Sequence, residues 1–267
     1  MLVSSVLCNS EVWFNLTSSD LDLLETVDLM LLRRILDAPK STPKEMMFLE
    51  LGVVPLRDII RQRRLNYLKY ILDQEADSML FKVFEKQSQN RTKKDWITTA
   101  LADLELLDLT VTFAEIQEMN KLKWKSMVKQ SMKEKSLKQL EVTKQKHSKV
   151  NKLKHPKLEI QKYFLPNEQA ITKEEIQLIF KIRSRGIRVK VNLKGLYDSY
   201  ECEVCQNEEE TQKHIYECQE IWKMKEYHDE NPPEYENIMI ENVKEKLEIA
   251  RIFKENLEIY EKMKIKK

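Results

Sequence analysis

Glycine is scarce in this chain, with three among 267 residues. Folds rich in strands generally place more glycine in their turns, so the scarcity argues against a sheet-based architecture. Charged residues make up 34% of the sequence and apolar residues 42%, which is enough to build hydrophobic cores. We therefore expect a mainly α-helical protein that forms one elongated domain or two small ones.

Long apolar runs are missing as well. No stretch approaches the roughly 20 apolar residues that a membrane-spanning helix requires. The opening residues MLVSSVLC lack both the basic start and the length of a secretory signal. These features predict no membrane association and an intracellular protein, cytoplasmic or nuclear, rather than a secreted one. Thiols stay reduced in those compartments, which disfavours disulfides.

Cysteine and histidine are rare, with four of each, yet three cysteines and one histidine fall within CEVCQNEEETQKHIYEC, residues 202 to 218. The spacing is C-x2-C-x8-H-x3-C. Two cysteines separated by two residues can direct both sulfurs at one ion, and residues four apart share a face of a helix, for which Thr211 is a suitable N-cap. Four nitrogen and sulfur donors fit a closed tetrahedral zinc site with no position for a catalytic water. We predict one structural zinc bound by Cys202, Cys205, His214 and Cys218. The alternative is a set of small apolar residues and a surface histidine that bind nothing.

Acidic residues surround these four positions. Only Lys213 opposes Glu201, Glu203, Glu208, Glu209, Glu210, Glu217 and Glu220. Three thiolates and one Zn²⁺ would add a further net negative charge, so this surface should repel phosphates unless a basic neighbour dominates. Because metal binding supplies much of the folding free energy of small zinc modules, we expect residues 200 to 220 to be disordered without zinc.

Positive charge is concentrated in two tracts, although the formal net charge is only +2. Between Lys121 and Lys157, thirteen lysines accompany only two acids, Glu134 and Glu141. The segment KIRSRGIRVKVNLK contains no acid. Such tracts are typical of polyanion binding, although lysine runs can also simply solvate a helix. The predicted contacts to RNA or DNA are Lys181, Arg183, Arg185, Arg188, Lys190 and Lys194.

Helical spacing and capping residues predict most of the secondary structure. Ser19 and Asp22 are expected to begin the first helix, which ends before Pro39, and Thr42 to begin the second, which stops at Gly52. A third helix is expected from Pro55, with Arg57, Arg61 and Arg64 on its outer side. Further helices are predicted over residues 92–109, 112–135, 171–186, with Thr172 and Glu175 as caps, and 234–267, and an extended segment over 187–195. Trp124 is expected in the core, with stacking on a base as the alternative.

Several stretches, taken in order, resemble one protein family. The segment NSEVWFNLTSSDLDLLETVDLMLLRRILDAPKSTPKEMMFLELGVVPLRDIIRQRRLNYLKYIL is similar to the region that follows the catalytic palm in reverse transcriptases of non-LTR (LINE-type) retrotransposons. The DW helix at Asp95 and Trp96, HSKV, FKIRSRGIRVKVNLKGLY and the C-C-H-C knuckle continue that order. The resemblance extends from residue 1 to about 225.

This resemblance implies a helical thumb-like bundle over residues 1–110, a basic helix and linker over 111–160, and a basic helix or extended segment with the zinc module over 161–225. Residues 233–267 are expected to form a C-terminal amphipathic helix. In that family the palm contains paired aspartates, whereas no two aspartates are adjacent in this chain. Because two-metal phosphoryl transfer needs clustered carboxylates, we expect a fragment that lacks the polymerase and is not itself an enzyme.

Two functional classes follow from these patterns. The first is a nucleic-acid-binding fragment that positions RNA or DNA for a reverse-transcriptase palm encoded upstream. The second is a helical protein-interaction module in which zinc is purely structural and the acidic knuckle binds a basic partner. The sequence does not distinguish RNA from DNA and does not indicate an oligomeric state.

Overall fold

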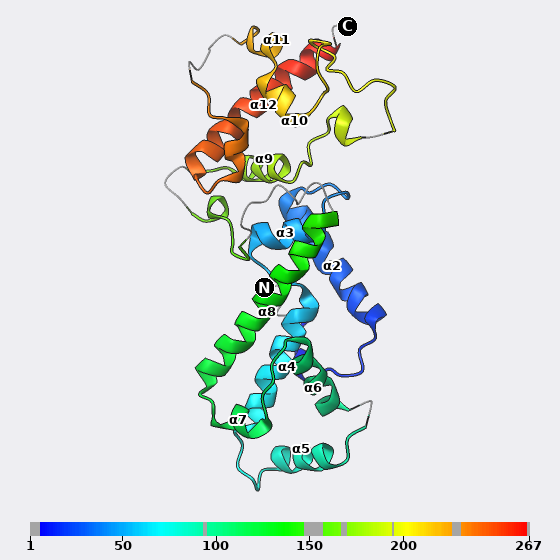
Figure 1. Cartoon of the computed structure of the whole chain (residues 1–267), viewed down its shortest axis with the longest axis vertical. Coiled ribbons are helices and arrows are strands. Elements are labelled where there is room, and N and C mark those ends of the chain that lie inside the picture. Colours follow the sequence, from blue (N-terminus) through cyan, green and yellow to red (C-terminus); the bar gives the residue numbers. More distant parts are fainter. Residues whose placement is uncertain are drawn as a thin grey trace. The chain divides into compact units, whose positions relative to one another are not determined.

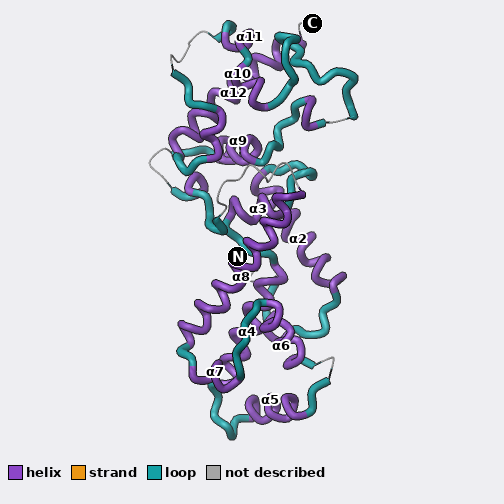
Figure 2. The backbone as a smooth tube through the Cα atoms, viewed as in Figure 1, coloured by secondary structure: helices purple, strands orange, loops and turns teal. Residues whose placement is uncertain are grey.

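The computed structural model describes residues 6–92, 95–146, 157–166, 170–193, 195–225 and 231–265. Within these ranges the ordered elements are helices, and Figure 2 shows no strand. One isolated antiparallel bridge joins Glu201 and Glu209. The prediction of a mainly α-helical protein is therefore confirmed. Residues 147–156, part of the basic helix and linker predicted over 111–160, lie outside the described residues.

The chain forms two compact units (Figure 1). Unit 1 comprises Met1–Met30 and Val53–Val142, and unit 2 comprises Leu31–Gly52 and Thr143–Lys267. This division differs from the predicted segments in two respects: residues 31–52 belong with the C-terminal half, and most of the basic helix belongs with the N-terminal half. Hydrophobic packing of α8 (Lys121–Lys146) and a buried polar network around α3 (Lys44–Leu51) explain the difference, as described below.

Unit 1 is built around one central helix, α4. Its elements are η1 (Ser10–Val12), the first part of α2 (Ser18–Leu36), α4 (Leu56–Leu72), α5 (Met79–Gln89), α6 (Trp96–Leu106), α7 (Phe113–Glu118) and most of α8 (Lys121–Lys146). Buried side chains from α4, α6 and α8 meet in one core that includes Leu65, Leu68, Ile97 and Val128. Trp124 is fully buried in this core and its indole N–H donates to the Leu65 carbonyl at 3.1 Å. The expectation that Trp124 belongs to the core is confirmed, and α8 is part of unit 1 for the same reason.

Helix starts follow the predicted chemistry at some positions and differ at others. Thr112 and Glu115 form the expected reciprocal capping box at α7, but the predicted single helix over 112–135 is interrupted before Lys121. The first helix begins earlier than predicted. Thr17 rather than Ser19 accepts the cap hydrogen bond, and its hydroxyl and backbone N–H both donate to Asp20. Both residues have oxygen side chains that can cap, so local spacing alone left the choice open.

Arg64 is a second departure from the sequence prediction. It was expected on the outer face of α4, yet it is only 4% exposed. Its guanidinium forms an ion pair with Asp103 of α6 and donates to the Trp13 carbonyl at 2.7 Å. The paired carboxylate and carbonyl replace the water that a buried charge would otherwise lose.

Unit 2 contains the remaining elements. They are the end of α2, α3 (Lys44–Leu51), η2 (Lys162–Phe164), α9 (Lys173–Arg183), η3 (Lys190–Asn192), α10 (Gln212–Glu217), α11 (Gln219–Trp222), η4 (Tyr235–Met239) and α12 (Val243–Ile265). Helix α12 packs against α9, α10, α11 and η4, and its buried residues Ile249, Phe253 and Tyr260 share one core with Ile215 and Ile221. The C-terminal helix was expected from residue 233, but residues 235–239 form η4 and α12 begins only at Val243; α12 belongs to the core of this unit.

Two local predictions in unit 2 are wrong and two are correct. Thr42 does not cap α3, whose N-cap is Pro43, and residues 190–192 form η3 rather than an extended segment. Thr172 caps α9 in a reciprocal capping box with Glu175, as predicted. Gly52 ends α3 in the left-handed region with φ of +62°, a conformation that glycine adopts without steric cost.

A buried polar network connects the elements of unit 2. Glu50 of α3 is 1% exposed and accepts hydrogen bonds from the Tyr163 hydroxyl and from Arg183 Nε at 2.9 Å. Arg183 also donates to the Ile238 carbonyl at 2.6 Å. The carboxylate of α3 thus pairs with a charge of α9, which explains why residues 31–52 belong to this unit.

The sequence predicts no membrane-spanning helix. None of the described helices is both long enough and apolar enough to cross a bilayer.

Candidate metal centre

Cys202 and Cys205, the first two cysteines of the motif, lie on a tight loop between Glu201 and Glu209, the two residues of the isolated bridge. The Cys202 N–H donates to the Glu208 carbonyl at 2.8 Å, and the Gln206 N–H donates to the Cys202 carbonyl at 2.9 Å. Gln206 has φ of +58°, which turns the chain back on itself directly after Cys205. This loop places both sulfurs on one side, as the C-x2-C spacing predicts.

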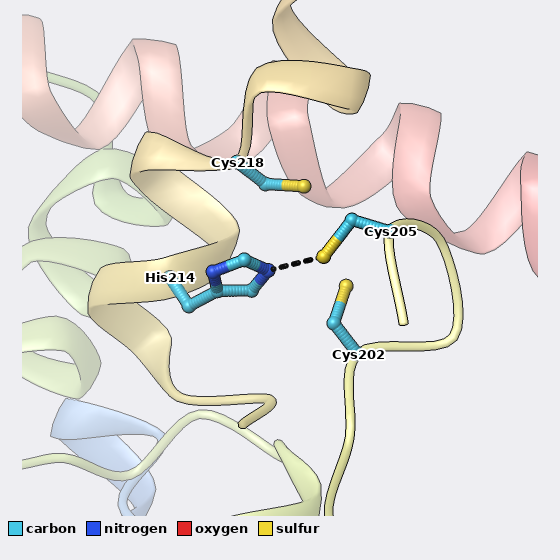
Figure 3. A group of neighbouring side chains, drawn as sticks. All are labelled: Cys202, Cys205, His214 and Cys218. Carbon is cyan, nitrogen blue, oxygen red and sulfur yellow. Dashed lines mark hydrogen bonds between the residues drawn. The ribbon is translucent and has the colours of Figure 1, made fainter. Parts of the chain in front are cut away.

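The other two residues come from the helical half of the motif. Thr211 caps α10 by accepting from the His214 N–H at 2.9 Å, which confirms the predicted cap. His214 lies within α10 and Cys218 follows its last residue, so one helical turn brings the two side chains to the same face. Figure 3 shows Cys202, Cys205, His214 and Cys218 pointing toward one another.

The distances fit a single ion. The ligand atoms of the four side chains all lie within 4.8 Å of one another, and His214 Nε2 is 3.3 Å from Cys205 Sγ. In a tetrahedral zinc site with bonds of about 2.0–2.3 Å, neighbouring ligand atoms are roughly 3.5–3.8 Å apart. Only small side-chain adjustments therefore separate this arrangement from coordination. All three cysteines are free thiols.

Backbone N–H groups are arranged to stabilise thiolates. Two approach each sulfur: those of Val204 and Cys205 at Cys202, of Asn207 and Glu208 at Cys205, and of Glu220 and Ile221 at Cys218. Burial raises the pKa of Cys202 to about 12 and also raises that of Cys218, because a buried thiolate loses its hydration. At Cys205 burial acts in the same direction, but the backbone N–H groups together with hydrogen bonds from the Cys202 and Cys218 side chains outweigh it and lower the pKa. A cation bound here would displace the thiol protons.

His214 is oriented for coordination through Nε2. Its other ring nitrogen, Nδ1, lies 3.2 Å from Glu208 Oε2, and the residue is only 8% exposed. A carboxylate that accepts from Nδ1–H holds the tautomer whose Nε2 lone pair is available to a metal. Glu208 is thus a supporting residue that the ligand spacing alone did not identify.

Elements distant in sequence support the loop and α10. Glu210 is buried and accepts from the Lys190 backbone N–H at 3.0 Å and from the Tyr260 hydroxyl of α12. Asn256, also of α12, donates to the carbonyls of Ile215 and Tyr216 at 3.1 and 2.8 Å. Helix α12 therefore holds the end of α10 from which Cys218 projects. The sequence did not indicate that Asn256 and Tyr260 support the metal centre, because an asparagine and a tyrosine on a helix are common.

The predicted ligand set is thus brought together, and this cluster could hold a metal ion such as zinc. It is closed by four protein donors, with Cys202 and Cys218 buried and Cys205 partly exposed. Such a donor set supports a structural ion better than a catalytic one.

The predicted nucleic-acid contacts differ in burial and in ion pairing. Arg183 and Lys190 are buried, 4% and 8% exposed, and Lys190 forms an ion pair with Glu203 at 3.1 Å. Both side chains pair with carboxylates inside the protein, so neither is available to contact a nucleic acid. Lys181 forms an ion pair with Asp37. Arg188 is exposed, Arg185 is half-buried, and Lys194 lies outside the described residues.

Part of the lysine-rich tract forms a row along α8. Lys121, Lys125 and Lys129 follow one another at intervals of four residues and are exposed, while Trp124 and Val128 face the core. Among the described residues, no carboxylate forms an ion pair with any of these three lysines. Like charges at this interval lower helix stability by about 0.2–0.5 kcal/mol per pair, so the row does not serve the helix itself.

Comparisons with protein-family models, curated proteins and solved structures find no match for this chain. The resemblance to non-LTR reverse transcriptases therefore stays a prediction that rests on the sequence motifs.

Proposed function

We propose that this protein binds RNA or DNA through the lysine row of α8, without catalysing polymerisation itself. The observation that carries the proposal is the exposed alignment of Lys121, Lys125 and Lys129. Helical geometry spaces them about 6 Å apart along the axis, so they form a continuous line of charge. Each lysine that neutralises a phosphate releases a condensed counterion, which makes such a line favourable for a polyanion.

We also propose that the four-residue cluster binds one zinc ion with a structural role. The convergence of three thiols and one imidazole, together with the N–H groups around the sulfurs, supports this assignment. The ion would join the Cys202–Cys205 loop to α10 and to the residue that follows it.

The sequence resemblance suggests the context of this binding. A thumb and zinc knuckle of a non-LTR reverse transcriptase would position template or target nucleic acid for a palm, and a palm encoded upstream is then the expected partner. Arg185 and Arg188 would add to the contact surface in unit 2.

Salt dependence tests the nucleic-acid proposal. The triple variant Lys121→Gln, Lys125→Gln and Lys129→Gln should bind duplex RNA or DNA more weakly, and the slope of log K against log salt should fall by about two to three. A matched control removes three exposed lysines of α12 through Lys244→Gln, Lys254→Gln and Lys262→Gln. Equal losses in the two variants, or no binding by the wild type at low salt, would refute the proposal.

The second function class, a protein-interaction module, is favoured by one observation. The exposed carboxylates of Glu201, Glu208, Glu209 and Glu217 surround the metal cluster and would attract a basic protein surface. If the wild type ignores both nucleic acids but binds a lysine-rich peptide in a salt-dependent way, this alternative replaces the first.

A further inference from the structure

Unit 2 contains a cavity of about 310 Å³ that is separate from the metal centre. Its walls come from the end of α9, from η3, from the first residues of α10 and from η4, and they include none of the four cluster residues. The volume is at the lower end of the range for small-ligand sites, which suits one small planar molecule rather than a large one.

The lining combines an apolar slot with an aromatic ring. Val191, Ile238 and Met239 contribute apolar surface, and Tyr235 contributes its ring. The Tyr235 hydroxyl donates to Gln212 Oε1 at 3.3 Å, which fixes the ring relative to α10. An aromatic ring beside a methionine is a surface on which a nucleobase can stack.

One wall of the cavity contains the guanidinium of Arg185. Among the described residues no carboxylate pairs with this guanidinium, whereas Lys213 at the same cavity pairs with Glu236 at 2.7 Å. Arg185 also holds an unfavourable backbone conformation, with φ of +51°, at a helix end where glycine is usual. The planar fork of donors in an arginine suits a phosphate.

Polar groups that can select among ligands are also present. Gln212 is 5% exposed and lines the cavity, and its amide nitrogen has no hydrogen-bond partner among the described residues. An unpaired buried donor costs free energy unless a ligand acceptor satisfies it. Nucleobases carry carbonyl and ring-nitrogen acceptors on their edges.

We propose that this cavity binds one nucleotide, with the base against Tyr235 and Met239 and the phosphate on Arg185. The inference deepens the proposed nucleic-acid binding and rests on it for the source of the nucleotide, an unpaired position in a single strand. The same chemistry would accept a free nucleoside monophosphate. Duplexes keep their bases stacked, so the cavity discriminates in favour of single strands.

Two variants of the full-length, zinc-loaded protein test the site. Val191→Phe fills the cavity without changing charge. Arg185→Gly removes the guanidinium while relieving the left-handed backbone, so its Tm should rise by a few degrees and lost binding cannot be ascribed to unfolding. Each should weaken binding of short single-stranded oligouridylate and oligoadenylate by about tenfold. Lys254→Ala is the control, because Lys254 is an exposed cation of α12 outside the cavity and outside the proposed contact surface, and should change affinity by less than about twofold at the same salt.

The outcomes separate the cavity from the lysine row. Single-strand affinity that is unchanged in Val191→Phe, or reduced equally by Lys254→Ala and Arg185→Gly, overturns the cavity proposal while duplex binding through α8 can still stand. Calorimetric titration with adenosine and uridine monophosphate provides the second arm. Binding of either that Val191→Phe abolishes supports the site even if the protein binds no strand, and that result assigns it to free nucleotides.

Discussion

The side-chain amino group of Lys246 is buried in the core of unit 2. Lys246 is 1% exposed, and its Nζ lies 5.2 Å from the centre of the Tyr163 ring. Burial lowers its pKa to about 7, and the nearby Arg183 adds to this effect. The carboxylates of Glu50 and Glu241 act in the opposite direction but do not overcome the loss of hydration.

This buried lysine makes stability depend on pH. In the unfolded chain Lys246 keeps its proton up to its ordinary pKa of 10.5, whereas in the folded state it loses the proton near pH 7. The unfolded state therefore binds more protons between these values, and the free energy of unfolding should rise with pH in this window, by at most about 1.4 kcal/mol per pH unit. Below pH 7 the destabilisation is present in full.

Lys246→Met tests this prediction, since it keeps the length of the side chain and removes the charge. The variant should be more stable than the wild type at pH 6 and should show a flatter rise between pH 7 and 10, measured by urea unfolding. Burial raises the pKa of Tyr163 well above its ordinary value, so that residue acts only above this window. Parallel curves for the two proteins would contradict the prediction.

The end of α3 shows how one element is fixed by another. A Cβ atom on Gly52 would lie 2.2 Å from the Ile160 nitrogen and 2.5 Å from the Glu159 carbonyl carbon. The Gln161 N–H donates to the Glu50 carbonyl at 3.0 Å, so the two backbone segments are held at this distance. Glycine is required here both for its positive φ and for the close approach.

A matched pair of glycine variants separates these two requirements. Gly195 also has a positive φ, of +85°, but a Cβ there would meet no atom within 4 Å. Gly195→Ala should therefore cost only the conformational strain, about 1 kcal/mol, whereas Gly52→Ala should cost roughly 3 kcal/mol because the backbone must also move. Chemical denaturation of both variants gives the comparison. Equal costs would show that the contact with residues 159–160 is unimportant.

At the scale of the whole molecule, the candidate metal centre belongs to one unit and the lysine row to the other. The hydrophobic core that contains Trp96 and Trp124 lies in unit 1. The core of unit 2 includes Cys202 and Cys218, so the metal ligands are part of its packing. Loss of the metal should therefore affect the two units unequally.

Metal removal tests this separation. The reduced protein should contain about one zinc per chain, and Cys205→Ser should release it and increase hydrogen exchange in α10, while amides of α4 keep their protection. Cys8→Ser is the control, because Cys8 is exposed and lies outside the cluster. Absence of zinc from the wild type, or equal zinc loss in the two variants, would refute the metal assignment.

Local spacing was sufficient to predict part of this protein. The spacing of the ligand set, the caps at Thr112, Thr172 and Thr211, and the positive φ at Gly52 that ends α3 are local features, so the pattern contains the information. The close approach of residues 159–160 to Gly52 is not a local feature. The helical class followed from composition and spacing for the same reason.

Local spacing could not predict which charged side chains are buried and which are exposed. Within one basic segment the fold buries Arg183 and exposes Arg188, because the partner of Arg183 is Glu50, which stands 133 residues earlier in the chain. Tyr260 and Asn256 support the metal loop and α10 from 40 to 50 residues away. Such pairings arise only when distant elements pack together, since a buried charge or amide is stable only where the complete fold supplies its partner.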